Sequence, residues 1–249
     1  MRIAVAGGTG TVGRYVVDTA RARGHGVAVL SRSRGVDVRT GSGLEAALEG
    51  VEAVVDVTNP GTTEREAATA FFTEVSGRLH TVGAACGVRH LVTLSIVGID
   101  RAAGYGYYAA KLAQERAVLA GPVPATVLRA TQFHEFAGQV LAWGRQRSTA
   151  HVPSLRVQTV AARTVGRVLV ELVEAGPAGT VPDLAGPEPA DLVALARALA
   201  ERRGLGIAVV ADPAPAEIPE DALLPGAGAR LEGPTFRAWL AGPDALPTT

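Results

Sequence analysis

The sequence has very little cysteine and no excess of either charge. Cys86 is the only cysteine among 249 residues, which excludes an intrachain disulfide and a cysteine-based metal cluster and is typical of a reducing compartment. We therefore expect a cytoplasmic protein. Lys and Arg together number 24, as do Asp and Glu, so the formal net charge is zero. Without a basic field, binding to nucleic acid or to an anionic membrane is not expected, and a small molecule is the expected partner.

Long apolar runs and clusters of metal ligands are missing as well. A strand-like run begins at Arg2, directly after Met1, which leaves no room for a signal peptide, and no stretch approaches the length needed to cross a membrane. The histidines show no ligand spacing, and His134 and Glu135 are adjacent, so they point in different directions on a helix. No metal site is predicted. Oligomeric state stays open.

Hydrophobic residues are plentiful, at 47% of the chain. Along the chain, short apolar runs typical of strands alternate with apolar residues at helical spacing. Because parallel strands need crossover helices, this alternation predicts an α/β fold with a doubly wound parallel sheet. Strands are expected at residues 3–6, 27–30, 54–57, 91–94 and 125–128, and helices near residues 12–24, 64–86 and 107–119.

The glycine motif Gly7-x-x-Gly10-x-x-Gly13 stands between the first strand and the first helix. Glycines at this spacing permit a tight turn, let the backbone approach a pyrophosphate and seat the helix on the sheet, while free N–H groups at the helix start attract the phosphate charge. A plain glycine-rich turn is the alternative. The motif predicts a Rossmann dinucleotide site, and its expected cofactor contacts are Gly7, Thr9, Gly10, Thr11, Val12 and Gly13.

The end of the second strand predicts which dinucleotide is bound. An NAD site places Asp or Glu there, whereas this chain has Ser31 and Arg32, which suit a 2′-phosphate. NADP(H) is therefore favoured over NAD(H), with a solvated loop arginine as the alternative. Asp37 and Val38 are candidates for the adenine edge or for a short edge strand. Thr58 and Asn59 border the ribose or nicotinamide, or form an ordinary turn.

After about residue 150 the pattern loosens. Helices are expected near residues 164–175, 190–203 and 234–241, with an extended or looped proline-rich segment at 213–225. Phe236, Trp239 and Leu240 in the last helix favour core packing. We expect residues 1–150 to form the NAD(P)-binding Rossmann domain and residues 151–249 to contribute a small C-terminal substrate-binding cap.

The only lysine of the chain, Lys111, lies four residues after Tyr107. Four residues make about one helical turn, so both side chains share a face, where the ammonium is expected to lower the pKa of the phenol and prepare it as a proton donor. The other 23 basic residues are arginines. An ammonium is a compact charge with a pKa that shifts on burial, so the single lysine indicates a chemical role.

These motifs together resemble the short-chain dehydrogenase/reductase superfamily, and the chain looks closest to its atypical NmrA-like, NAD(P)H-binding branch. The resemblance covers about the first 135 residues. It extends to the run Thr93-Leu94-Ser95-Ile96-Val97-Gly98 and, less specifically, to residues 181–187.

The resemblance implies a catalytic role for three residues. Tyr107 is the acid/base on the substrate oxygen, Lys111 binds the nicotinamide ribose, and Ser95 either contacts the substrate oxygen or is a structural serine at the strand end. The loop that carries Thr131 and Phe133 covers the nicotinamide. Phe136 and Trp143 are candidates for an apolar substrate pocket or for core packing.

The expected function is an NADPH-dependent oxidoreductase that reduces a carbonyl or quinone-like small molecule. Two alternatives stay open at this point. One is a redox-neutral epimerase or dehydratase on the same scaffold, and the other is an NADP(H)-sensing regulatory protein of NmrA type.

Overall fold

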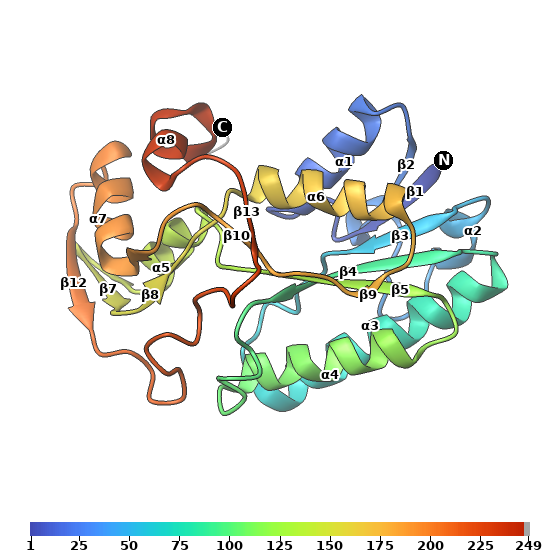
Figure 1. Cartoon of the computed structure of the whole chain (residues 1–249), viewed down its shortest axis with the longest axis horizontal. Helices are drawn as coiled ribbons and strands as arrows, with labels where there is room; N and C mark the ends of the chain where they lie inside the picture. Colours follow the sequence, from blue (N-terminus) through green and yellow to red (C-terminus); the bar gives the residue numbers. More distant parts are fainter. Residues whose placement is uncertain (247–249) are drawn as a thin grey trace.

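A parallel sheet forms the centre of the molecule, of which the computed structural model describes residues 1–246. Seven strands follow the order β13-β10-β5-β4-β3-β1-β2, β9 pairs with β5, and every pairing within this sheet is parallel among the described residues (Figure 1). The strands are β1 (Arg2–Ala6), β2 (Gly26–Leu30), β3 (Ala53–Asp56), β4 (His90–Ile96), β5 (Ala125–Ala130), β9 (Gly179–Thr180), β10 (Leu184–Ala185) and β13 (Arg230–Leu231). The predicted Rossmann fold class is confirmed.

Helices cover both faces of this sheet (Figure 1). Because side chains alternate along a strand, Ile3 and Val5 pack under one helical layer, whereas Ala4 and Ala6 pack under the other. The first layer is α1 (Gly13–Ala22) and α6 (Ala162–Ala175), and the second is α2 (Leu44–Leu48), α3 (Arg65–Ala85) and α4 (Gly106–Ala120). The chain turns to opposite sides of β1 to form β2 and β3, which creates a switch point at the end of β1, where ligands bind in this class of sheet.

A second lobe, here called the cap, has a hydrophobic core of its own that includes Val140, Val152, Leu199 and Trp239. Its proline-rich segment at 213–225 forms no helix or strand, as expected, and buries Leu223 against this core. The cap comprises α5 (Phe136–Trp143), β6 (Arg145–Gln146), β7 (Thr149–Pro153), β8 (Arg156–Val157), β11 (Ala190–Asp191), α7 (Leu192–Arg202), β12 (Ala208–Asp212), α8 (Phe236–Ala241) and the 3-10 turn η2 (Pro243–Ala245).

Residue 150, where the boundary between the two parts was expected, falls inside β7. After β8 the chain returns to the Rossmann lobe through α6, β9 and β10. It then enters the cap again through β11, α7 and β12, and comes back once more with β13. Residues 151–249 therefore supply much of the cap and also one helix and three strands around the central sheet.

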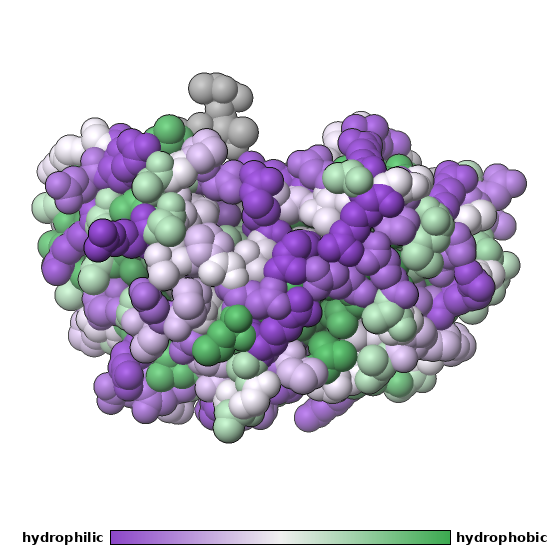
Figure 2. All heavy atoms as spheres, turned by 45° about the horizontal axis from the view of Figure 1, so that its top comes forward, coloured by the Kyte–Doolittle hydropathy of each residue, from purple (hydrophilic) through white to green (hydrophobic). Residues whose placement is uncertain are grey.

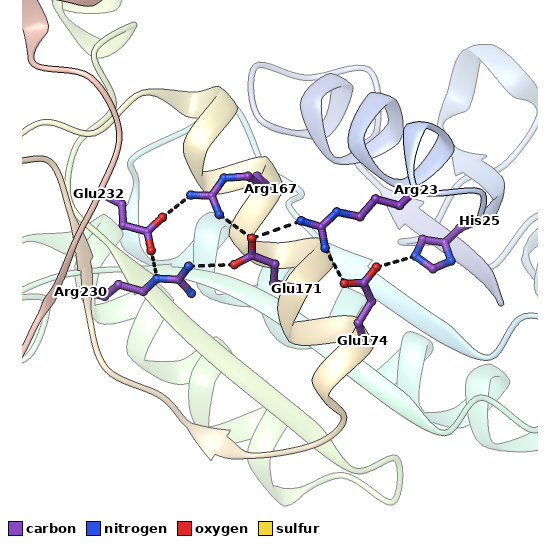
Figure 3. Close-up of polar contacts among 7 residues, drawn as sticks. All are labelled: Arg23, His25, Arg167, Glu171, Glu174, Arg230 and Glu232. Carbon is purple, nitrogen blue, oxygen red and sulfur yellow. Dashed lines mark hydrogen bonds and ion pairs between the residues drawn. The ribbon is translucent and has the colours of Figure 1, made fainter.

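A network of ion pairs holds one of these returning segments in place (Figure 3). Glu171 on α6 accepts from Arg23 at the end of α1 and from Arg230 in β13, at 3.2 and 2.8 Å. Arg167 on α6 bonds both Glu171 and Glu232. All these side chains are partly exposed, so each pair contributes little alone, but the network joins three segments distant in sequence. Figure 2 shows hydrophilic residues gathered across the middle of one face of the molecule.

Candidate active site

A single cleft of about 1060 Å³ lies at the carboxyl ends of the strands and brings together most of the predicted site. It runs from the loop after β1 and the 3-10 turn η1 (Arg32–Arg34) to the end of β4, the start of α4 and α5 of the cap. The predicted residues that line it are Gly7, Thr9, Gly10, Thr11, Val12, Ser31, Arg32, Asp37, Val38, Thr58, Asn59, Ser95, Tyr107, Lys111 and Phe133. Gly13 and Thr131 are not among the lining residues.

The glycine loop is shaped by contacts that admit no side chain. Gly7 has a φ of +78°, and a Cβ on it would lie 2.8 Å from the carbonyl oxygen of Val57. A Cβ on Gly13 would lie 2.1 Å from the carbonyl oxygen of Gly7, so Gly13 seats the helix on the loop without facing the cleft. Among residues 1–246, the backbone N–H groups of Thr11, Val12 and Gly13 have no hydrogen-bond acceptor. A loop of this form suits an anionic pyrophosphate.

Two glycine substitutions are expected to separate nucleotide binding from folding. Gly10 is exposed, and its Cβ would lie 3.3 Å from the Gly7 oxygen, so Gly10→Leu places a bulky side chain over the loop with little strain on it. It should abolish NADP(H) binding with nearly unchanged thermal stability. Gly13→Ala should instead lower stability, by about 1–3 kcal/mol for an overpacked site. Calorimetric titration and thermal unfolding measure the two effects. Unchanged NADP(H) affinity in Gly10→Leu would mean that the glycine loop does not bind the nucleotide.

The far end of the cleft carries cations and hydroxyl groups. Arg32 is exposed, and its guanidinium has no hydrogen-bond or ion-pair partner among the described residues. The hydroxyl oxygens of Ser31 and Ser33 lie 3.1 Å apart. Arg39 and Thr40 also line the cleft and were not predicted, because nothing local distinguishes Arg39 from the other arginines. Arg39 pairs with Glu74 at 2.5 Å.

Asp37 and Val38 have structural contacts of their own at this end. The Asp37 carboxylate accepts from the backbone N–H groups of Arg39 and Thr40, at 2.9 and 3.3 Å, and so forms a turn. Val38 is buried in the core under α2 and α3. Both border the cleft, and an adenine contact for either stays a prediction.

At the opposite end, Ser95 and Asn59 frame Tyr107. Ser95 stands near the end of β4 and is 2% exposed, and its hydroxyl is buried with no hydrogen-bond partner in residues 1–246. Asn59 donates from Nδ2 to the Tyr107 hydroxyl at 3.1 Å and accepts from the Gly61 N–H at 2.9 Å. Asn59 thereby fixes the phenol oxygen, whose own hydrogen remains free to be donated.

The pKa of the Tyr107 phenol lies above its ordinary value, although the neighbouring Lys111 was expected to lower it. Burial, with the neighbouring Tyr105, raises the pKa of Tyr107 to about 12. The Lys111 ammonium does not offset this, because it is directed at other groups: it donates to the carbonyl oxygen of Leu94 at 2.8 Å and to Oε1 of Gln114. It also lies 4.6 Å from the centre of the Phe72 ring.

Burial acts on Lys111 as well. The side chain is 4% exposed, and burial lowers its pKa to about 8, against the opposing influence of Asp56 and Glu115. An ammonium has three N–H groups, and two have protein acceptors here. The third N–H has no hydrogen-bond acceptor among residues 1–246, and Lys111 lines the cleft. Since a guanidinium is larger and planar, this packing explains why the chain has lysine at this one position.

Several aromatic and polar residues after β5 lie elsewhere than expected. The Thr131 hydroxyl donates to the carbonyl oxygen of Gln158 at 2.6 Å, which holds the loop without facing the cleft. Phe136 and Trp143 pack edge to face, with ring centres 5.9 Å apart, and Trp143 is 70% exposed. Neither lines the cleft, whereas Gln139 from the same helix does. Sequence reasoning missed Gln139, because no local motif marks it.

Residues 1–246 contain no group of three or more His, Cys, Asp and Glu side chains placed to hold a metal ion. None of the helices in this part of the chain has the length and apolar character needed to cross a membrane.

Comparison with known proteins identifies solved structures of the same fold. No protein-family model and no curated protein matches the chain, but solved structures do. A NAD-dependent NDP-hexosamine 5,6-dehydratase involved in tunicamycin biosynthesis has a TM-score of 0.73 at 15% identity, over 96% of this chain and 95% of that chain. A dTDP-4-dehydrorhamnose reductase from Bacillus anthracis in complex with NADP has a TM-score of 0.66 at 13% identity, over 85% and 84%.

A third solved structure is a short-chain dehydrogenase/reductase superfamily protein from Agrobacterium tumefaciens with bound NAD. Its TM-score is 0.63 at 21% identity, and 86% of each chain is covered. The chain shares its fold with these three solved structures. This is the fold that the resemblance implied, and the narrower placement in the NmrA-like branch stays a prediction.

Proposed function

We propose that the protein is an NADP(H)-dependent oxidoreductase of the short-chain dehydrogenase/reductase type that reduces a carbonyl or quinone-like small molecule. One observation carries the proposal. The Ser95 hydroxyl, the Tyr107 phenol and the Lys111 ammonium share one cleft with the glycine loop. At the end of that loop, the N–H groups of residues 11–13 have no acceptor among the described residues. NAD or NADP bound to proteins of the same fold supports a nicotinamide cofactor.

The residues present fit such a cofactor along the whole cleft. The N–H groups at the start of α1 would receive the pyrophosphate, and the remaining N–H of Lys111 would bind the ribose next to the nicotinamide. Ser31 and Arg32 would hold a 2′-phosphate through charge-assisted hydrogen bonds. Arg39 and Thr40 add a cation and a hydroxyl at the same end.

The catalytic end has the groups that carbonyl reduction needs. A bound nicotinamide supplies the hydride for the carbonyl carbon. Tyr107 is protonated at neutral pH, because its pKa is raised to about 12, and it would transfer its proton to the carbonyl oxygen, which completes the alcohol. The Ser95 hydroxyl would donate a hydrogen bond to the same oxygen. Asn59 would stabilise the resulting phenolate by its hydrogen bond to the phenol oxygen.

The substrate would enter from the cap side of the cleft. Pro60, Ile96 and Phe133 give this end an apolar lining, and Gln139 on α5 brings one amide from the cap. Such a surface suits a small, largely apolar molecule with a polar group near α5. We propose that the cap contributes to substrate binding through α5.

A redox-neutral reaction is the second candidate, supported by the fold shared with a dehydratase. Separate incubations with NADPH and with NADP+ and a panel of carbonyl, quinone and epimerisable compounds test both. Loss of NADPH absorbance together with an alcohol or quinol product is expected for the reductase. Product formation with NADP+ and no net formation of NADPH would favour the epimerase or dehydratase. Tight NADPH binding with no turnover of any compound would contradict both and favour a sensor.

Arg32→Ala is expected to reduce the preference for NADP(H) over NAD(H). The loss of a charge-assisted contact should cost about 1.5–3 kcal/mol, or roughly ten- to a hundredfold in NADPH affinity, with little change for NADH. Arg34→Ala is the matched control, since Arg34 belongs to the same turn but does not line the cleft. Dissociation constants for both cofactors measure the effect. Equal losses of NADPH affinity in the two variants would mean that Arg32 acts only as one of several surface charges.

A further inference from the structure

Three buried polar side chains, two from α4 and one from β3, are joined in a row by hydrogen bonds. Asp56 and Gln114 are each 1% exposed and Lys111 is 4% exposed. Gln114 donates from Nε2 to Oδ2 of Asp56 at 3.0 Å and accepts at Oε1 from the Lys111 ammonium. Asp56 ends β3, whereas Lys111 and Gln114 lie on α4 one turn apart. The expected mechanism uses Lys111 and gives no role to the other two.

The chemistry of the two end groups fixes the orientation of the amide between them. A carboxylate only accepts hydrogen bonds and an ammonium only donates them. Gln114 must therefore turn its NH2 group to Asp56 and its carbonyl oxygen to Lys111. The other carboxylate oxygen of Asp56 accepts from the N–H and the hydroxyl of Thr58, at 3.0 and 2.7 Å, which holds the carboxylate in place.

The other charged groups around Lys111 leave Asp56 as its main unpaired counter-charge. Glu115 also faces Lys111 from α4, but it is engaged by Arg129 of β5 through two hydrogen bonds of 2.9 and 2.8 Å. Helix α3 contributes the Phe72 ring, β4 contributes the carbonyl oxygen of Leu94, and Tyr107 of α4 lines the same cleft as Lys111. A buried ammonium without a counter-charge would lose its proton readily.

We propose that Gln114 is a positioning residue that links Lys111 to the Asp56 carboxylate, holding the ammonium charged and in place with one N–H free for the ligand. The hydrogen bond from Lys111 to Gln114 does not depend on a bound cofactor. Its consequence for binding rests on the proposed function, in which that N–H contacts the nicotinamide ribose.

The single lysine allows a direct test. In protein labelled with 13C at lysine Cε, Lys111 gives the one side-chain signal, and its titration in the cofactor-free protein reports the ammonium itself. The wild-type midpoint is expected at about pH 8. Gln114→Met keeps the length of the side chain but removes the amide, so the midpoint should fall by about one to two pH units, the value of a hydrogen bond to a charged group. Gln146→Met, at an exposed glutamine of β6, is the matched control and should leave it unchanged.

Asp56→Asn provides a second variant of nearly equal shape. Its amide no longer dictates the orientation of Gln114, so the midpoint should fall here too, and this variant decides the matter where Gln114→Met does not fold. If Asp56 acts through Gln114, the Lys111 midpoint in the variant that carries both substitutions should fall little further than in Gln114→Met alone. An unchanged midpoint in the folded single variants would overturn the proposal. Fully additive shifts would overturn it as well, because they would mean that the Gln114 amide carries none of the influence of Asp56 on Lys111.

NADPH affinity measured across the same pH range distinguishes this inference from the proposed function. The affinity should weaken above the midpoint in each variant, so the weakening should begin at lower pH in Gln114→Met. A shifted lysine titration with no matching change in NADPH affinity would support the role of Gln114 and contradict the contact of Lys111 with the ribose.

Discussion

Tyr107→Phe is expected to lower turnover by about 10²–10⁴-fold with NADPH affinity nearly unchanged, the usual range for loss of a general acid. Phenylalanine keeps the ring that packs edge to face against Phe72, with ring centres 5.8 Å apart. The variant loses the proton and the hydrogen bond from Asn59, so the defect should fall on the chemical step.

The measurement compares kcat for an accepted substrate with the dissociation constant for NADPH. Tyr105→Phe serves as the control, because Tyr105 stands at the start of the same helix, packs against Tyr108 and does not line the cleft. Full reductase activity in Tyr107→Phe would remove the proton-donor role. A large loss in Tyr105→Phe would point to disturbed packing among the tyrosines.

Lys111→Arg is expected to weaken NADPH binding and to lower turnover together. The guanidinium keeps the charge, but it does not fit the positions of the Leu94 carbonyl and Gln114, so the contact with the ribose should be lost. That loss corresponds to about ten- to a hundredfold in affinity. Thermal unfolding of the variant separates this effect from a loss of folding.

The same variant gives a test of the pH dependence. A pKa of about 8 means that Lys111 is charged below that pH and neutral above it. NADPH affinity of the wild-type protein should therefore be highest on the acid side and fall as the pH rises through 8. Arginine stays protonated, so the residual affinity of Lys111→Arg should not show this fall. A pH-independent affinity in the wild-type protein would contradict the contact with the ribose.

Local patterns were sufficient to predict the glycine loop and strands β1–β5 of the sheet, but not the short strands β9, β10 and β13. The strand periods around Ile3 and Val54 and the glycine spacing around Gly10 depend on neighbours in sequence, and the structure confirms the fold that they predict. The glycines also have distinct steric roles, since Gly13 meets the loop backbone and Gly10 does not. That difference depends on the folded loop and has no signal in the motif.

The electrostatics of the site could not be predicted in the same way. The spacing of Tyr107 and Lys111 shows that the side chains share a helix face, but not which acceptors the ammonium reaches. Those acceptors come from β4 and from Gln114, which itself depends on Asp56 in β3. Burial then dominates the pKa of the phenol. Contacts of this kind form between strands and helices distant in sequence, as do those of Arg39 and Gln139 with the cleft.

The late return of α6 to the sheet makes the nucleotide-binding lobe dependent on residues synthesised after the first segment of the cap. Val165 and Leu169 cover the same sheet face as Val5 and Val92. A polypeptide that ends at residue 150 would leave the part of this face under α6 uncovered and, from its exposed apolar side chains, should aggregate. Transplanting the cap onto a related scaffold would likewise require exchange of several separate segments. The lobe that resembles an independent unit in sequence is completed only when most of the chain has been made.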